Sequence, residues 1–580
     1  MSPARRDRRG LRSAGAAPAG SQVGGARSEP RKTPGRLRSA RLSRASRWIA
    51  PAAILCVAAV LLLWNLTDTY LWQDEANTAV MAVRLLKYGR PLAYDGRNLL
   101  TDDNFAAQDR QTIDARTKDP RKAVEDCVRR GTMTADGMWT YHPWGQFVLA
   151  GLGIALLGQT TLAARLPFAL AGLATVFATY WLVRRFLRSE LIAALACVLL
   201  TLDVYWLLHS RQARYYPLTS LFFVLSLIAY GRWQQGARWG AATFVGVAWC
   251  WFQIDYGTVW PVFGVLLLDA FVRALLTHWK AAWKPLATGL ALAAAIAPFV
   301  FFYRLGTRKS GEMGTWLHRF KGAVFNINEY VVPVVILLAA LVWVVARWRR
   351  FPPLESRLVL LGCAMLVALP VWVATVAPTT YVRYVIMVAP VGAMVTAWWC
   401  VRALGPYAAR AAWLAVAVVA LTPWLCKPLT VLWTAPRGFD TGTVLRSELS
   451  LIGTDVFGHR PDPNRLVIEW LEKNSSPSDE ILVNYEDLPM MYYLPNLIRG
   501  GIVAFRAEDD RTTPPRFVVL RRTVPFVYWE VFAREVRRYS WVAVPVKAPD
   551  IRWGNNPDPE GHLQDRSRAA DLLIFERAAP

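Results

Sequence analysis

Two adjacent carboxylates, Asp74 and Glu75, come directly after the first hydrophobic span of the chain. They stand where that span should leave the membrane, before a long loop that returns to it. Ionisable side chains at a membrane boundary indicate chemistry, and for carboxylates the two roles in question are proton transfer and metal binding. The alternative is that the pair forms a solvated helix cap.

Arginine side chains form a second candidate group, in three short polar stretches beside apolar runs. Arg211 and Arg214 lie within residues 209–216, and Arg383 lies within residues 381–384. The third stretch holds Arg304, Arg308, Lys309, Arg319 and Lys321. The planar guanidinium pairs bidentately with phosphate, and strongly so near a region of low dielectric. The arginines therefore indicate a lipid phosphate as ligand, whereas the alternative is that they merely extend to lipid head groups.

Two further acids, Asp203 and Asp255, lie near the same boundary. Ionisable residues at this depth are expected to have a functional partner. For Asp203 the partner is Arg211 or Arg383, so a structural ion pair and a catalytic role both stay open. Asp255 occupies a very short turn and would contact a polar acceptor or a metal. Tyr215, beside the arginines, is an accessory candidate for the same region.

The elements that position these residues are membrane helices. Of the 580 residues 54% are hydrophobic, and apolar runs near the ~20 residues that cross a bilayer recur about eleven times. The fold class is therefore a polytopic α-helical membrane protein with about eleven transmembrane helices. The predicted spans lie near residues 48–66, 164–183, 190–208, 217–231, 240–252, 258–272, 285–303, 329–346, 357–377, 384–400 and 408–426.

Charge sets the orientation of these spans. Residues 1–47 hold 13 Arg or Lys against two acids and lack a hydrophobic period, so this tail should be disordered and cytoplasmic. The apolar segment 143–158 has only about 16 residues and is interpreted as an interfacial helix. With that choice all five inner connections carry Arg or Lys, as the positive-inside rule requires. The candidate acids and arginines then face outward.

Three domains follow from this topology. They are the tail, a transmembrane domain at 48–426 that includes a first extracytoplasmic loop at 67–163, and an extracytoplasmic domain at 427–580. In the last, a helix near Asn464 to Lys473 and several short apolar runs predict a small mixed α/β domain. No disulfide framework, metal-ligand spacing or nucleotide-binding loop is visible in the sequence. The expected surroundings are lipid, with no nucleic-acid partner.

Several of these pieces together resemble a known family. They are the acid pair after the first span, Tyr141-His142-Pro143-Trp144 before a short apolar segment, Ala164-Arg165-Leu166-Pro167 opening a span, the stretch from Arg211 to Leu218, and Arg383-Tyr384 followed by Pro390. Their order and membrane side resemble the bacterial relatives of protein O-mannosyltransferases and aminoarabinose transferases, which are glycosyltransferases of the C-type membrane fold (GT-C). The likeness covers residues 48 to about 400.

The resemblance implies inverting transfer of a monosaccharide, as a hexosyl or pentosyl group, from a polyprenyl phosphate to an acceptor hydroxyl on the outer face. Asp74 matches the general base, which removes the hydroxyl proton, while the outward arginines would hold the departing phosphate. His142 stands where relatives carry Lys or His before proline, so it would touch the donor phosphate or hydrogen-bond within its loop. Glu75 is left as a catalytic support or metal ligand.

The chain also departs from the family pattern. Relatives often carry a further acid where Arg214 to Tyr216 stands, and Lys-Gly where Asp255 to Gly257 stands. The acceptor (glycan, lipid or protein) and any divalent metal therefore stay open. A transporter or flippase of lipid-linked sugars would use the same arginines without chemistry, and a glycan ligase or polymerase would need a lipid diphosphate donor. The expected location is a bacterial inner membrane, with the N-terminus in the cytoplasm.

Overall fold

The structure is a computed structural model that describes residues 46–100, 125, 127–307, 315–377, 379–423, 445–500, 514–521, 537–550, 555–557 and 571–578. The chain divides into two units, Met1–Trp48 and Ile49–Pro580. Nearly all of the predicted basic tail, together with Arg308 and Lys309, lies outside the described residues.

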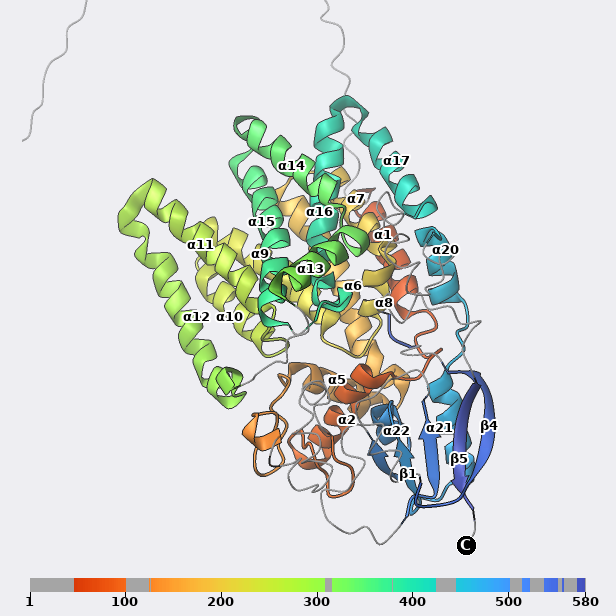
Figure 1. The fold of residues 1–580 in the computed structure, drawn as a ribbon. Coiled ribbons are helices and arrows are strands. Elements are labelled where there is room, and N and C mark those ends of the chain that lie inside the picture. The colour runs from red at the N-terminus through yellow and green to blue at the C-terminus, as the bar shows by residue number, and fades with distance from the viewer. Residues whose placement is uncertain are drawn as a thin grey trace, which may run out of the picture. The chain divides into compact units, whose positions relative to one another are not determined.

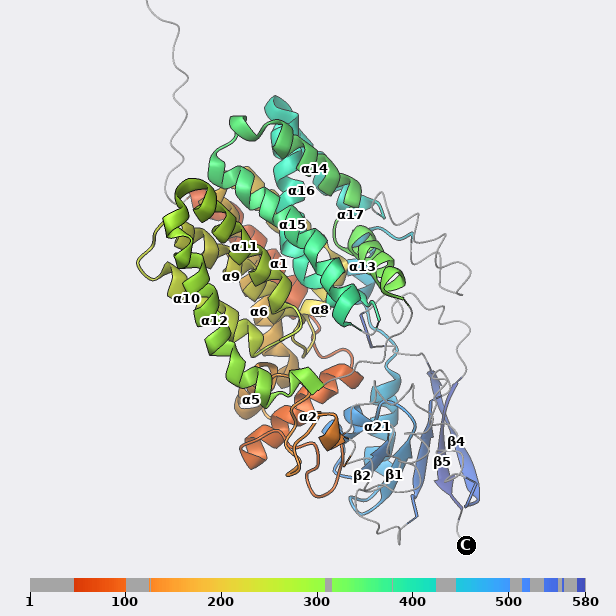
Figure 2. The same cartoon turned by 60° about the vertical axis from the view of Figure 1, so that its left-hand side comes forward.

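The predicted spans coincide with helices, because a chain in lipid must satisfy its own backbone hydrogen bonds. Figures 1 and 2 show them as a set of neighbouring helices, with α11 beside α12. These helices are α1 Ser46–Leu63, α6 Thr161–Phe186, α7 Glu190–Leu202 with α8 Val204–Ser210, α9 Tyr216–Gln234, α10 Gly240–Phe252, α11 Val259–His278, α12 Trp283–Phe302, α14 Val334–Ala346, α15 Pro353–Val376, α16 Ala389–Leu404 and α17 Ala408–Leu421.

Fewer helices meet the length and apolarity needed to cross a membrane than coincide with predicted spans. Among the described residues, five helices are long and apolar enough to cross a membrane, or up to seven if each of two bent pairs counts as one span. A mostly helical multi-pass membrane protein is thus confirmed, whereas eleven crossings stay a prediction. One bend, of 73°, lies at Asp203 between α7 and α8. The other bend, of 87°, lies between α13 (Trp316–Tyr330) and α14. Helix α13 carries Arg319 and Lys321.

Helices α2 and α5 lie in the predicted first outer loop. The first is α2 (Gln73–Tyr88), which begins after the extended residue Trp72 and ends at Gly89, whose φ of 72° suits glycine. The second is α5 (Gly145–Leu157), at the predicted interfacial segment. Figure 1 shows α2 beside α5, and α2 also packs against α22 (Asp487–Tyr493). These contacts make α2 a bridge between the membrane helices and the C-terminal domain.

The C-terminal residues form the predicted small α/β domain. Strand β1 pairs in parallel with β2 and β3, while β5 is antiparallel to β3 and β4, giving the order β2-β1-β3-β5-β4. Figure 2 shows α21 beside this sheet. The elements are α20 Glu448–Ile452, α21 Pro463–Asn474, β1 Glu480–Val483, α22, β2 Leu497–Gly500, β3 Phe517–Leu520, β4 Trp541–Pro549 and β5 Asp571–Arg577.

The C-terminal domain shares its core with the juxtamembrane region. Leu488 and Tyr492 of α22 belong to the same buried apolar cluster as Ala76 and Val80 of α2. On the other side, Tyr70 packs against the core of the sheet. Burial of apolar surface is the main driving force for such docking. The start of α2 is therefore enclosed by two layers of structure that come from distant parts of the sequence.

Candidate active site

Asp74 lies in the first turn of α2 and is partly exposed. Glu75 sets this turn, because its carboxylate accepts the backbone N–H of Trp72 at 3.4 Å and so caps the helix start. The Asp74 side chain is 28% exposed, and its Oδ2 lies 3.2 Å from Nη1 of Arg383. The structure thus brings the predicted base and one predicted phosphate-binding arginine into direct contact.

Aromatic rings surround the guanidinium group of Arg383. Its central carbon lies 4.2 Å from the ring centre of Tyr381 and 5.7 Å from those of Trp72 and Tyr384. Cation–π contacts of this kind orient the planar group and shield it from water. A shielded guanidinium interacts more strongly with an anion than an exposed one does.

Arg214 and His142 adjoin the same helix. The Arg214 guanidinium donates to the side-chain oxygens of Asn77 and Thr78 on α2, both at 3.3 Å. It also donates to Nε2 of His142 at 3.1 Å, which makes that nitrogen the acceptor and places any ring proton on Nδ1. The Arg214 side chain lies over the ring of Tyr215, 5.4 Å from its centre.

A cavity of about 480 Å³ opens beside Arg383. Its volume is in the range of small-molecule sites. The polar side chains of its lining include Tyr141, Tyr215, Asp255, Arg383 and Tyr384. The rest of its wall is mostly apolar and comes largely from the C-terminal end of α15, with Trp260, Trp372, Val373, Val376, Ala377, Leu305 and Met387. One cavity thus combines a cationic group with a lipid-like wall.

Asp255 belongs to this cavity and is held within its own turn. Its carboxylate accepts the backbone N–H of Gly257 at 3.0 Å and the hydroxyl of Thr258 at 2.5 Å. Burial raises the pKa of Asp255, although these two hydrogen bonds and the charge of Arg214 oppose the rise. The carboxylate therefore has local partners and still lines the cavity.

Three predicted site residues have structural partners elsewhere. Glu75 is fully buried, and its two oxygens accept from Nε and Nη2 of Arg165 at 2.7 and 2.6 Å. Arg211 donates to the carbonyl oxygens of Leu61, Trp64 and Asn65, at and just beyond the C-terminal end of α1, at 2.6 to 3.3 Å. Asp203 accepts the backbone N–H of Trp206 at 3.0 Å and so caps α8.

Some residues around Asp74 were not predicted from the sequence as site residues. Arg165 opens a predicted span, and a charged residue in an apolar helix is a signal that could have identified it as the partner of an acid. Trp72 and Tyr381 surround Arg383, but an aromatic residue at a membrane boundary has too many common roles to be singled out.

A divalent metal finds no ready site in the part of the chain that the structure describes. No group of three or more His, Cys, Asp or Glu side chains there is placed to hold a metal ion. Mg²⁺ and similar ions need several oxygen ligands, whereas Asp255 is the one acid among the described residues that line the cavity.

No protein-family model matches this chain, and no curated protein matches it significantly. Solved structures do match. ArnT from Cupriavidus metallidurans in the apo state is similar at 14% identity and a TM-score of 0.53, over 92% of this chain and 98% of that one. The same protein bound to undecaprenyl phosphate gives 13% identity and a TM-score of 0.52 over the same shares.

The oligosaccharyltransferase of Archaeoglobus fulgidus in the apo form also matches, at 11% identity and a TM-score of 0.46, over 88% of this chain and 76% of that one. At such identities the ArnT likeness establishes the architecture, which includes both the membrane helices and the C-terminal domain. The resemblance drawn from the sequence is confirmed at this level, and the chain has a GT-C-like fold, that of the C-type membrane glycosyltransferases.

Proposed function

We propose that this protein transfers a monosaccharide from a polyprenyl-phosphate donor to an acceptor hydroxyl, with inversion at the anomeric carbon. The observation that carries the proposal is the contact between Asp74 and Arg383 at a cavity with an apolar wall. Such a transfer needs a general base and a phosphate-binding group within one site. Further support comes from the shared fold of ArnT, which has been solved with undecaprenyl phosphate bound.

Each group has a defined task in this reaction. Asp74 accepts the proton of the acceptor hydroxyl as its oxygen attacks the anomeric carbon. The bond between that carbon and the phosphate oxygen breaks, and the electron pair leaves with the lipid phosphate. Arg383 and Arg214 hold the negative charge of the leaving group, while His142 keeps Arg214 oriented through their 3.1 Å contact.

Inversion constrains the geometry of the Asp74–Arg383 pair. The acceptor hydroxyl and the leaving phosphate must lie on opposite faces of the sugar, as in inverting glycosidases, where the two carboxyl groups are about 6.5–9.5 Å apart. A contact of 3.2 Å leaves no room for a sugar ring between Asp74 and a phosphate on Arg383. Donor binding therefore opens this pair, so that the phosphate replaces Asp74 as the partner of Arg383.

Two residues that line the cavity with Arg383 would select substrates. Asp255 and Tyr215 line the same cavity and can accept or donate hydrogen bonds to hydroxyl groups of a sugar or an acceptor. We assign structural roles to three residues for which other roles were predicted. Glu75, predicted as catalytic, forms a buried ion pair with Arg165. Arg211, predicted to bind phosphate, and Asp203, predicted as accessory, have backbone groups as partners.

The setting of the site is part of the same proposal. We assign residues 48–426 to a transmembrane domain and 427–580 to an extracytoplasmic domain, in a bacterial inner membrane with a cytoplasmic N-terminus. Asp74 and Arg383 then face outward, where a lipid-linked sugar is available as donor. Accessibility of single engineered cysteines in these domains to a membrane-impermeant thiol reagent checks the orientation.

A donor panel tests the function. Purified full-length protein in lipid nanodiscs is given radiolabelled sugars on polyprenyl monophosphate and on polyprenyl diphosphate, with mixed envelope glycans, lipids and proteins as acceptors. We expect transfer from the monophosphate donor alone. Transfer only from the diphosphate would favour a ligase or polymerase. Movement of the donor across liposome membranes without transfer would favour a flippase.

A further inference from the structure

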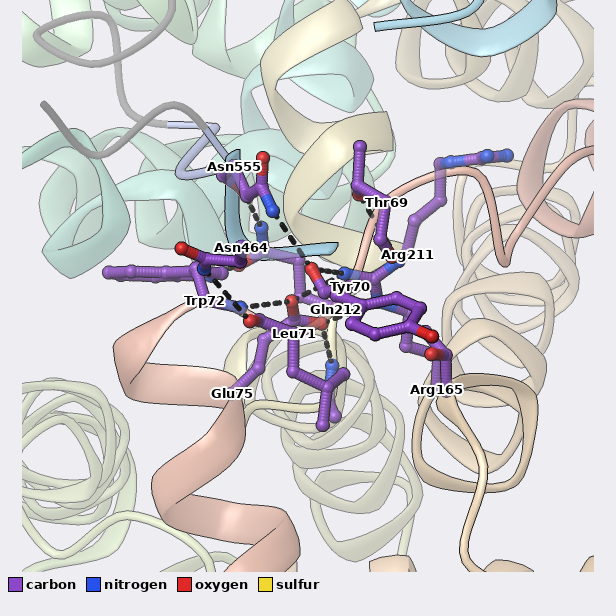
Figure 3. A network of polar contacts seen from close by, with 12 residues as sticks. Thr69, Tyr70, Leu71, Trp72, Glu75, Arg165, Arg211, Gln212, Asn464 and Asn555 are labelled. Carbon is purple, nitrogen blue, oxygen red and sulfur yellow. Dashed lines mark hydrogen bonds and ion pairs between the residues drawn. The ribbon is translucent and has the colours of Figure 1, made fainter. Parts of the chain in front are cut away.

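Residues 66–72, within the segment that joins α1 to α2, are held on both sides, and we call them the linker (Figure 3). On the side of the membrane helices, Arg165 donates to the backbone carbonyl oxygens of Thr69 and Tyr70 at 2.8 and 3.2 Å. The same guanidinium binds Glu75, three residues after the linker. One buried arginine of α6 therefore fixes both the linker and the first turn of α2.

The C-terminal domain holds the linker from the opposite side. Asp462 accepts the backbone N–H of Tyr70 at 2.5 Å, and Asn555 donates to the carbonyl oxygen of the same residue at 3.0 Å. Asn464 donates to the carbonyl oxygen of Leu71 at 3.3 Å. Figure 3 shows Asn464 and Asn555 pointing toward the linker. These bonds go to backbone atoms, so they fix the path of the chain itself.

Gln73 extends this docking into α2. Its side-chain Nε2 donates to Oδ1 of Asp487 at 2.7 Å, and its Oε1 accepts the backbone N–H of Leu488 at 3.3 Å. Both Gln73 and Asp487 are buried. The carboxamide is therefore held at both ends by two consecutive residues of the C-terminal domain.

Asp74 stands between these two anchors. Side chains of consecutive helical residues point about 100° apart, so fixing Gln73 and Glu75 sets the direction of the side chain between them. That direction is toward Arg383, 3.2 Å away. Glu75 is fixed by the membrane helices and Gln73 by the C-terminal domain, so the orientation of Asp74 depends on both parts of the molecule.

Stability alone does not account for the Gln73–Asp487 contact. Glu75 already caps the start of α2, and α2 already shares an apolar core with α22. A buried carboxylate is expensive to desolvate, and such contacts are often no better for stability than apolar packing. Burial accordingly raises the pKa of Asp487. What the contact adds is a fixed orientation.

We propose that Gln73 is a positioning residue, through which Asp487 of the C-terminal domain holds Asp74 in its catalytic orientation. This inference rests on the proposed function, since it assigns the C-terminal domain a part in the transfer reaction. The domain is then a component of the active site in addition to any part it takes in acceptor binding.

A charge exchange tests the inference in the full-length protein. Gln73→Glu places two carboxylates in contact, whereas in Gln73→Glu/Asp487→Asn the new carboxylate can accept from both the new amide and Leu488. Asp487→Asn alone is the matched control, because the Gln73 amide can still donate to the new side-chain carbonyl. Misplacing a reacting group by about 1 Å can cost on the order of 10²-fold in rate.

The expected results are a kcat at least about 10-fold lower in Gln73→Glu, a donor KM changed by less than about 3-fold, and recovery of kcat in the double variant. Hydrogen exchange of the peptide covering 66–76 should rise in Gln73→Glu and return in the double variant. If Gln73→Glu does not fold, Gln73→Asn, which is one methylene shorter, takes its place, with the same loss of kcat expected.

The outcomes separate this inference from the proposed function. Wild-type kcat in Gln73→Glu, or a double variant as slow as the single one, overturns the inference while the function stands. Absence of transfer by the wild-type protein with every donor overturns the function instead. Hydrogen exchange in the linker that is the same in the wild type, both single variants and the double variant overturns the docking role independently of activity.

Discussion

Glu486, the residue before α22, should make the stability of the C-terminal domain depend on pH. The residue is buried, its backbone has a φ of 64°, and its carboxylate accepts from Asn464 at 3.3 Å. Burial raises its pKa from 4.5 to about 7, against the opposing charge of Arg521. The neutral acid is therefore the form that the folded domain favours.

The sign and size of the effect follow from this shift. A raised pKa means that the folded state binds the proton more tightly, so the contribution is complete below about pH 4.5 and is lost as pH rises through about 7. At about 1.4 kcal/mol per pH unit, the difference between 4.5 and about 7 corresponds to roughly 3 kcal/mol. Glu486→Gln, which stays neutral, should gain most of this amount over the wild type at pH 8 and under about 1 kcal/mol at pH 5.

Pulse proteolysis across a urea series measures the free energy of unfolding of the C-terminal domain in the intact protein. The control is Glu472→Gln on the exposed face of α21, which should change stability equally and little at both pH values. A Glu486→Gln variant that is no more stable than the wild type at pH 8 would show that the folded protein does not disfavour the ionised form of Glu486. The assigned environment would then be wrong.

Three further predictions concern stability and donor binding. Arg165→Met leaves Glu75 buried and unpaired, so we expect a loss of about 3–5 kcal/mol, seen as a low yield of monodisperse protein in size-exclusion chromatography; a wild-type yield and melting temperature would contradict it. Gly153→Ala should destabilise the packing of α5 on α6 by about 1–3 kcal/mol, because a Cβ there would overlap the carbonyl oxygen of Ala163. The control is Gly151→Ala, where a Cβ has room. A thermal melt should show a lower melting temperature for the first variant and an unchanged one for the second. Arg383→Lys loses bidentate phosphate binding, so kcat/KM for the donor should fall about 10- to 100-fold at unchanged melting temperature, and an unchanged kcat/KM would remove Arg383 from the phosphate site.

The membrane helices could be predicted from the sequence because the signal is local. Each apolar run near bilayer length must satisfy its own hydrogen bonds, so its position along the chain is enough to place a helix. Helix α2 lacked such a signal, since its first residues include Gln73, Asp74 and Glu75, and its apolar face is buried by α22 from more than 400 residues away. The small sheet was predictable as an α/β domain, but not its strand order.

The candidate site was predictable in part for the same reason. Membrane side alone placed Asp74, Arg214 and Arg383 on one face, and the structure brings them together. The predicted membrane side could not distinguish the role of Arg211 from that of Arg214. These residues are three positions apart in one turn, yet Arg211 points to α1 and Arg214 to α2. That choice depends on which carbonyl groups a neighbouring helix end leaves unpaired, and this is a tertiary property.

In the proposed mechanism Asp74 acts as the general base, and the donor phosphate replaces it on Arg383. The direct measurement pairs single-turnover sugar transfer with equilibrium binding of undecaprenyl phosphate, for wild type and Asp74→Asn in nanodiscs. We expect transfer to fall by about 10²- to 10⁴-fold, while the lipid phosphate binds as tightly as before or more tightly, because its competitor for Arg383 is gone. Near wild-type transfer by Asp74→Asn, or loss of lipid-phosphate binding in a folded variant, would show that this mechanism is wrong.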